Sequence, residues 1–303
     1  MTERLELQPL LFSIAYRMLG SVAEAEDVVQ EAFLRRERVL RQGGQIESSK
    51  AFLTTVTTRL AIDQLRAARL RRETYFGPWL PEPLVTGSEP DPAEVAEMAD
   101  SLSLSFLVLL ETLAPVERAV YLLREVFDYG YDEIAQIVDR SEVNCRQIFT
   151  RAKRRIEEGK PRFEVDRERQ QELAGSFVEA LQEGEVEKLL ELLAPDAVFT
   201  GDGGGVGRGL PKPVYGAPQV SRLLAAFGRE GRSLSARLEL TRINGQPGTL
   251  NFDDQGRLIN VFVFEIAGGV VQGVRSIINP HKLAHLGYRL SPIARQERKA
   301  LDD

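Results

Sequence analysis

Arginines gather in two short stretches of this chain, and their spacing suits contact with phosphate groups. In the first stretch, Arg59, Arg66 and Arg69 fall near one face of a helix with about 3.6 residues per turn. Asp63 lies on the same face at salt-bridge spacing, so a solvated, salt-bridged surface is the alternative. The formal net charge of -6 argues against a nucleic-acid partner only as an average over the whole chain.

The second basic stretch ends a pattern that is typical of a helix-turn-helix. A helix that begins at Pro115 is followed by a break at "DYGY", a short helix "YDEIAQIV", a turn at "DRS" and a last helix that Ser141 is placed to cap. Asp139 stands where the usual turn glycine would be, and it tolerates left-handed backbone geometry. Cys145 and Ile148 have the spacing of buried residues in such a motif, so we expect Cys145 to be core and not a reactive thiol.

The last helix of this pattern carries the residues that would enter a major groove of DNA. In such a motif the exposed N-terminal residues meet base edges, and a basic C-terminal end meets phosphates. The DNA-contacting candidates are Ser141, Glu142, Asn144, Arg146, Gln147, Arg151 and Arg154, with Lys153 and Arg155 adding positive charge. A generic helical hairpin is the alternative, and the basic C-terminal end disfavours it.

Few residues in the last third of the chain suit acid–base or metal chemistry. Glu265, in a strand-like segment, is the best candidate for a catalytic acid. His281 and His285 have the i,i+4 spacing of two metal ligands on one helix face, but no third ligand is apparent. We therefore expect no cofactor and favour a helix-surface or inter-domain role for the two histidines.

The elements that position these residues change in type near residue 160. Helical periodicity dominates before that point, whereas two amphipathic helices after it lead to strand-like segments from "SARLELTRI" to "VVQGVRSIINP". This order predicts an α+β domain with an antiparallel sheet. The sequence has no apolar run long enough to cross a membrane, no signal-peptide pattern and one cysteine, so we expect a cytoplasmic protein.

Two blocks before the helix-turn-helix resemble the extracytoplasmic-function sigma factors of bacterial RNA polymerase. They are "LFSIAYRMLGSVAEAEDVVQEAFLR" and "AFLTTVTTRLAIDQLRAARLRRE", and the resemblance covers residues 5 to 160. It implies core RNA polymerase as partner, through the beta-prime clamp helices and the beta flap, and promoter DNA. The implied polymerase-binding residues are Asp27, Gln30, Glu31 and Phe33, and those implied for the -10 element are Arg59, Asp63, Arg66 and Arg69.

The part of the chain from about residue 164 onward resembles the SnoaL-like domain, a cone-shaped fold whose curved sheet wraps around helices and leaves a pocket. A subgroup of these sigma factors carries such a domain, together with the motifs "WLPEP", "DGGGK" and "NPDKL". The matching residues here are Trp79, Leu80, Pro81, Glu82 and Pro83, then Asp202, Gly203, Gly204 and Gly205, then Asn279, Pro280 and Lys282. Val206 replaces the lysine of the second motif and His281 the aspartate of the third, while Arg208 is a candidate substitute for the missing positive charge.

The glycine run and the single tryptophan predict a contact between the linker and the third domain. Three successive glycines permit positive φ and a close approach of another segment, whereas a phosphate-binding loop lacks its GK[ST] ending here. A large aromatic side chain in a proline-stiffened connector is expected to be docked. We expect Trp79 to pack near the "DGGG" turn, and the alternative is that it covers the end of its own first domain.

These features predict a multidomain chain, with two all-α sigma domains followed by an α+β SnoaL-like domain. The expected parts are region 2 at 1–74, a linker at 75–98, region 4 at 99–163 and the SnoaL-like regulatory domain at 164–303. We expect a non-enzymatic sigma factor that its last domain regulates in cis, with no dedicated anti-sigma factor. The alternatives are a small-molecule receptor in that domain, or an enzyme tethered to DNA.

Overall fold

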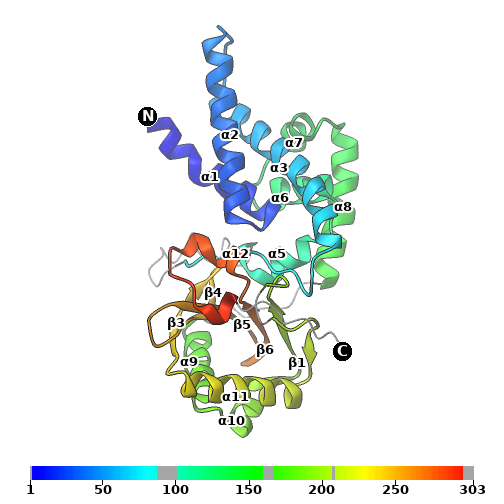
Figure 1. Ribbon diagram of the computed structural model, residues 1–303. Coiled ribbons are helices and arrows are strands. Elements are labelled where there is room, and N and C mark those ends of the chain that lie inside the picture. Colours follow the sequence, from blue (N-terminus) through cyan, green and yellow to red (C-terminus); the bar gives the residue numbers. More distant parts are fainter. Residues whose placement is uncertain (1, 87–100, 160–166, 207–208, 296–303) are drawn as a thin grey trace. The chain divides into compact units, whose positions relative to one another are not determined.

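The computed structural model describes residues 2–86, 101–159, 167–206 and 209–295, and the chain divides into two compact units (Figure 1). The helical unit comprises residues 1–74 and 106–160, and the sheet unit comprises 75–105 and 161–303. The short helix α5 (Leu104–Leu110) crosses the boundary between them in sequence. Residues 75–86, which we call the linker segment, therefore belong to the sheet unit.

Six helices build the described part of the helical unit, and α3 packs against α1, α2, α6 and α7. They are α1 (Thr2–Leu19), α2 (Val22–Arg41), α3 (Ser49–Glu73), α6 (Pro115–Glu125), α7 (Tyr131–Val138) and α8 (Glu142–Gly159). The sequence sets where several of them begin. The Ser21 and Ser48 hydroxyls accept backbone N–H groups in the first turns of α2 and α3, and Pro115 occupies the first turn of α6.

A buried polar network joins the first helices of this unit to α6. Arg118, 1% exposed, donates to the Met18 carbonyl at 2.7 Å and pairs with Glu111 at 2.8 Å. Arg72 of α3 pairs with the same carboxylate and donates to the Leu19 carbonyl at 2.8 Å. Because a buried charge is costly without a partner, this network specifies one arrangement of the helices within the unit.

The sheet unit contains one six-stranded sheet in the order β2-β1-β6-β5-β4-β3. Its strands are β1 (Leu193–Asp202), β2 (Val214–Tyr215), β3 (Arg237–Ile243), β4 (Gln246–Phe252), β5 (Leu258–Ala267) and β6 (Val270–Ile277). The expectation of a purely antiparallel sheet is wrong at one pair, because β1 and β6 run parallel. The long connection from β1 through α11 (Ala217–Ser233) permits this parallel pairing.

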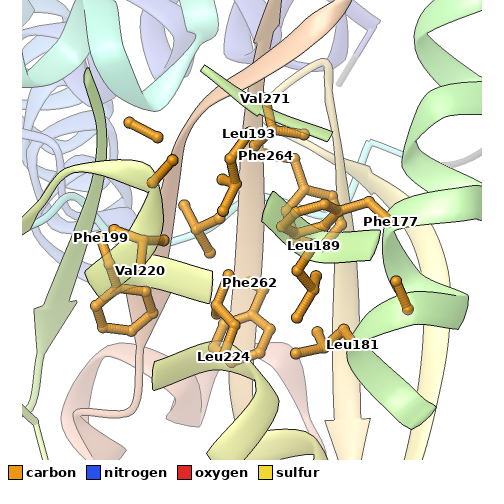
Figure 2. Close-up of a cluster of buried hydrophobic side chains, with 14 of the residues drawn as sticks. Phe177, Leu181, Leu189, Leu193, Phe199, Val220, Leu224, Phe262, Phe264 and Val271 are labelled. Carbon is orange, nitrogen blue, oxygen red and sulfur yellow. The ribbon is translucent and has the colours of Figure 1, made fainter. Parts of the chain in front are cut away.

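Three helices cover one face of this sheet and enclose its apolar core (Figure 1). They are α9 (Arg167–Glu183), α10 (Val186–Leu192) and α11, while α12 (Pro280–Leu283) and the short 3-10 helices Ala284–Leu286 and Pro292–Arg295 follow β6. Phe262 and Phe264 of β5 belong to this core, while the alternate residues Val261 and Val263 are buried outside it. Phe264 meets Phe177 edge-on (Figure 2). Strand periodicity thus places the aromatic side chains inside.

Candidate nucleic-acid interface and linker site

The second helix of the helix-turn-helix presents the predicted DNA-contacting residues on its surface. Ser141 caps α8, because its hydroxyl accepts the Asn144 N–H at 3.3 Å. All seven residues of this predicted set are exposed: Ser141, Glu142, Asn144, Arg146, Gln147, Arg151 and Arg154. Arg146 lies over the Tyr131 ring at 4.4 Å, and 3.5 Å separates its guanidinium from the Glu142 carboxylate. Exposed side chains are free to enter a groove of DNA. The surface ion pair of Arg146 with Glu142 is weak, so little free energy is lost when Arg146 exchanges it for contacts with DNA.

The core side of the same motif follows the sequence prediction closely. Asp139 ends α7 in the left-handed conformation, with φ of 55°. Cys145 and Ile148 are buried at 0% and 7% exposure, as expected. Burial raises the pKa of the Cys145 thiol, so it stays protonated at neutral pH and serves as packing.

The arginine stripe of α3 is partly engaged within the helical unit. Arg66 pairs with Asp63 at 2.9 Å on the surface. Arg59 instead donates from Nε and from a terminal nitrogen to the carbonyls of Ile137 and Gln136, each at 2.8 Å, at the C-terminal end of α7. Free carbonyls at a helix end favour a cation. The side chain of Arg69 lies outside the described part of the chain.

The predicted polymerase-binding residues lie on α2 and divide by burial. Asp27 and Gln30 are exposed, and Glu31 is half-buried. A hydrogen bond from Arg35 at 2.8 Å lowers the pKa of Glu31, so its carboxylate is charged at neutral pH. Phe33 faces inward at 6% exposure, which leaves the polar edge of α2 as the accessible surface.

The linker segment is held on the sheet unit by a buried carboxylate. Asp202, at the end of β1, has no exposed surface. Its two oxygens accept hydrogen bonds from the Tyr75 hydroxyl and from the backbone N–H of Leu80, the latter at 2.8 Å. Asp202 also pairs with the Lys282 ammonium at 2.6 Å. One acidic side chain therefore binds two points of the linker segment and the basic residue of the third motif.

Lys282 completes this contact from α12. Its ammonium, on a side chain 8% exposed, also donates to the Leu80 carbonyl. It lies 4.2 Å from the ring centroid of Trp79 and 5.0 Å from that of Tyr75. A desolvated ammonium over aromatic faces is attracted by the ring quadrupoles. The residues of the three motifs therefore come together, and Trp79 packs beside the charge that pairs with Asp202.

Further contacts extend along the rest of the linker segment. His285 contacts the Pro83 carbonyl through Nε2 at 2.8 Å, and its Nδ1 lies 3.9 Å from the Glu82 carboxylate. Asn244 accepts the Leu84 N–H at 2.8 Å through its side chain and donates its own N–H to the Leu84 carbonyl at 2.7 Å. At Pro83 and Leu84 the linker segment is thus held through its backbone.

The glycine turn gives the linker segment room to approach. Gly204 has φ of +60°, and a Cβ there would lie 2.2 Å from the Asn279 amide nitrogen and 3.1 Å from the Tyr75 hydroxyl. Gly205 has φ of +77°, and its Cβ would lie 3.3 Å from the Cβ of Phe76. The prediction that this turn accepts a neighbouring segment is confirmed. Arg208, the suggested substitute for the missing lysine, lies outside the described residues.

The remaining candidates for acid–base or metal chemistry have structural contacts. Glu265 pairs with Arg275 and accepts a hydrogen bond from Ser105. His281 is exposed at the start of α12, away from the linker contacts of His285. Among the described residues, no group of three or more His, Cys, Asp or Glu side chains is placed to hold a metal ion.

Sequence reasoning missed two residues of the linker site, which is the set of residues that binds the linker segment. Tyr75 lies four residues before the tryptophan, outside the motif, and only its aromatic character marks it. Asn244 takes a positive φ of 52° in the turn between β3 and β4, where asparagine is tolerated. For His285 the sequence favoured a helix-surface or inter-domain role, and the structure gives its partners as Pro83 and Glu82.

Comparison with known proteins gives matches for both helical regions and for most of the chain. Residues 5–71 match Sigma-70 region 2, and residues 103–156 match Sigma-70 region 4. The chain is 36% identical over 245 residues to the ECF RNA polymerase sigma factor SigJ of Mycobacterium tuberculosis, across 80% of this chain and 78% of that protein. The chain belongs to the ECF RNA polymerase sigma factors.

Two further comparisons extend this likeness into the sheet unit. The probable ECF RNA polymerase sigma factor SigI of Mycobacterium tuberculosis is 31% identical over 277 residues, covering 90% of this chain and 91% of the relative. The crystal structure of M. tuberculosis SigJ matches with a TM-score of 0.74 and 30% identity, over 96% of this chain and 100% of that one. The predicted architecture, helical sigma regions followed by a SnoaL-like α+β unit, is therefore confirmed.

Membership of the ECF sigma factors fixes the general activity of this chain. It is a sigma factor that directs transcription initiation, with core RNA polymerase and promoter DNA as its partners. Its relatives are sigma factors and not enzymes. Within the described ranges, no helix combines the length and the apolar character that a membrane span requires.

Proposed function

We propose that the SnoaL-like unit regulates this sigma factor in cis by holding the linker segment, in place of a separate anti-sigma factor. The observation that carries the proposal is the buried contact in which Asp202 and Lys282 bind the backbone of Leu80. The linker segment lies in sequence between the region 2 and region 4 matches. Docking of the linker segment therefore restrains the part of the chain that must span the two promoter elements. Release of the segment should raise the rate of transcription initiation.

The contacts of Arg59 support a resting form in which one residue proposed to read DNA is engaged within the helical unit. Arg59 of α3 binds the carbonyl end of α7, the first helix of the helix-turn-helix. A guanidinium held in this way is not available to a phosphate of the -10 element. We propose that polymerase separates α3 from α7 before both regions contact DNA, so the free protein binds promoter DNA weakly at physiological salt.

Specific residues are proposed for each partner surface. On α2, Asp27, Gln30 and Glu31 are proposed to contact the beta-prime clamp helices, with Phe33 fixing that helix from the core. Arg59, Asp63, Arg66 and Arg69 are assigned to the -10 element. Region 4 is proposed to meet the beta flap and, through the exposed residues of α8, the -35 element. Glu142, Asn144, Arg146 and Gln147 are assigned to bases and Arg151 and Arg154 to phosphates.

The regulatory proposal is tested by run-off transcription with core RNA polymerase and the full-length chain. Trp79→Ala removes the ring beside Lys282 without leaving a buried charge unpaired. Losing a cation–π contact of ~1 kcal/mol shifts the equilibrium between the docked and undocked linker segment severalfold. We expect a severalfold rise in transcript. Tyr215→Ala, which removes an exposed aromatic side chain from β2 of the same unit, is the matched control.

The two variants separate regulation from general damage. Transcription that rises for Trp79→Ala and stays at the wild-type level for Tyr215→Ala supports the proposal. Equal transcription by all three proteins, with equal binding to core polymerase, contradicts it.

A further inference from the structure

The side chain of Arg146 on α8 is held by a ring from the other helix of the helix-turn-helix. The Cζ atom of its guanidinium lies 4.4 Å from the ring centroid of Tyr131, the first residue of α7. The negative face of an aromatic ring attracts a guanidinium in this position. The Arg146 side chain nevertheless keeps 59% of its surface exposed. It is therefore oriented and accessible at the same time.

The ring of Tyr131 is itself held from the core of the helical unit. Phe149 of α8 meets it edge-on, with ring centroids 6.1 Å apart, and Phe149 stacks on Tyr121 of α6 at the same centroid distance. Tyr121 is 4% exposed and Tyr131 is half-buried, so this row of three rings runs from the core to the surface. Packed aromatic neighbours restrict the positions that the Tyr131 ring can take. Tyr131 is thus a rigid support for Arg146.

A guanidinium that is held over a ring still has its edge for hydrogen bonds. The five N–H groups of arginine lie in the plane of the guanidinium and point outward from its edge. Among the base edges in the major groove, guanine offers two acceptors, O6 and N7, that suit a bidentate arginine. The ion pair with Glu142, at 3.5 Å between exposed side chains, is weak and exchanges at little cost. The ring contact and a guanine contact therefore do not compete.

Holding the side chain before DNA arrives should strengthen and sharpen the base contact. Arginine has many rotamers, and ordering them on binding opposes association. A contact that already favours one orientation in the protein without DNA lowers this cost. An exposed cation–π contact corresponds to about two- to fivefold in an equilibrium constant.

We propose that Tyr131 is a positioning residue that orients Arg146 toward a guanine of the -35 element. The inference rests on the proposed contact between α8 and the -35 element. It adds the base that Arg146 reads and the residue of α7 through which that reading becomes selective.

The test uses the full-length chain with core RNA polymerase and a library of templates whose promoter region is randomised. Templates that give run-off transcripts are sequenced, so that the base preference at each position is measured. We expect the wild type to select guanine at one position of the -35 element, and Arg146→Ala to lose that selection alone. Tyr131→Phe keeps the ring and should keep the preference. Tyr131→Leu should weaken it about two- to fivefold at this position only.

Two controls tie this loss to Arg146. Tyr131→Leu should have no further effect on the guanine preference in an Arg146→Ala background, because Tyr131 acts through Arg146. Replacing the selected guanine with 7-deazaguanine removes the N7 acceptor. This change should lower transcription for the wild type and Tyr131→Phe, less for Tyr131→Leu, and not for Arg146→Ala.

A fluorinated series separates the charge of the ring face from its packing. Phenylalanine and its 4-fluoro, 3,5-difluoro and 3,4,5-trifluoro derivatives at position 131 have nearly the same shape, but each fluorine withdraws negative charge from the ring face. The guanine preference should fall stepwise along the series. This series decides the question if Tyr131→Leu fails to fold.

The outcomes separate the inference from the proposed function beneath it. A guanine preference that stays constant in Tyr131→Leu and along the fluorinated series overturns the positioning role and leaves the contact of α8 with the -35 element intact. Base preferences that Arg146→Ala does not alter overturn both the inference and the assignment of Arg146 to a base. Selection of another base at the position that depends on Arg146 overturns the reading of guanine.

Discussion

Replacing Asp202 with asparagine isolates the charge that holds the linker segment. Asp202→Asn keeps the size of the side chain but removes the counter-ion of Lys282, whose side chain is 8% exposed. An unpaired buried charge costs about 3–5 kcal/mol, so the docked state should lose at least about a hundredfold in population relative to the undocked state. Lys282→Met alone leaves the opposite charge unpaired, and the double variant removes both.

Trp79 is the only tryptophan in the chain, so its fluorescence reports docking directly. We expect acrylamide to quench Trp79 more strongly in either single variant than in wild type. Urea unfolding of the sheet unit should show that Asp202→Asn combined with Lys282→Met costs about 2 kcal/mol less than the sum of the single changes. Unchanged quenching in Asp202→Asn, or additive effects in the cycle, would refute the role given to this ion pair.

Three other predictions concern the glycine turn of the sheet unit and two residues of the helical unit. Gly204→Ala should destabilise the sheet unit in urea by about 1–2 kcal/mol more than Gly256→Ala. Both glycines have φ near +60° to +70°, but only Gly204 faces Asn279. Equal effects would contradict the close approach of Asn279 to Gly204. Arg59→Ala should destabilise the helical unit by about 1 kcal/mol, because Arg59 binds the carbonyls at the end of α7. Arg66→Ala, which removes only a surface pair, should cost less than about 0.5 kcal/mol. Equal losses of stability would show that the contact with α7 does not stabilise the unit. Burial raises the pKa of Cys145, so iodoacetamide at pH 8 should label the native thiol far more slowly than the urea-unfolded one, and similar rates would contradict its burial.

Local signals in the sequence were sufficient for the helix-turn-helix. Ser141 caps α8 and Asp139 takes the left-handed conformation because each depends on its own backbone neighbours. The buried positions of Cys145 and Ile148 follow from helical periodicity alone. These features need no information from the rest of the chain.

Long-range pairing was harder to predict. β1 follows α10 directly, so its alternating pattern is masked by the helical run before it, and its parallel pairing with β6 depends on residues about 75 positions away. The same reason hides the partner of Arg59, since helical spacing pointed to Asp63 and the structure gives the carbonyls of α7. Spacing identifies the face of a helix but not the element that packs against it.

The linker site was predicted in outline, and its chemistry was not. A lone tryptophan among prolines indicated docking, and three glycines indicated where. The sequence did not indicate that Lys282 would lie over the Trp79 ring while pairing with Asp202, because that depends on α12 and β1 meeting in the fold. The replacement of aspartate by His281 is accommodated because this side chain is exposed.

A reversible covalent lock on the linker segment tests the central claim most directly. A Cβ on Gly205 would lie 3.3 Å from the Cβ of Phe76, close to the separation that a disulfide requires. The Phe76→Cys/Gly205→Cys protein is assayed by run-off transcription with core polymerase, oxidised and then reduced, with each single variant as control. We expect transcription to fall severalfold on oxidation and to recover on reduction, in the double variant alone. Equal transcription by the oxidised and reduced double variant would contradict regulation by linker docking.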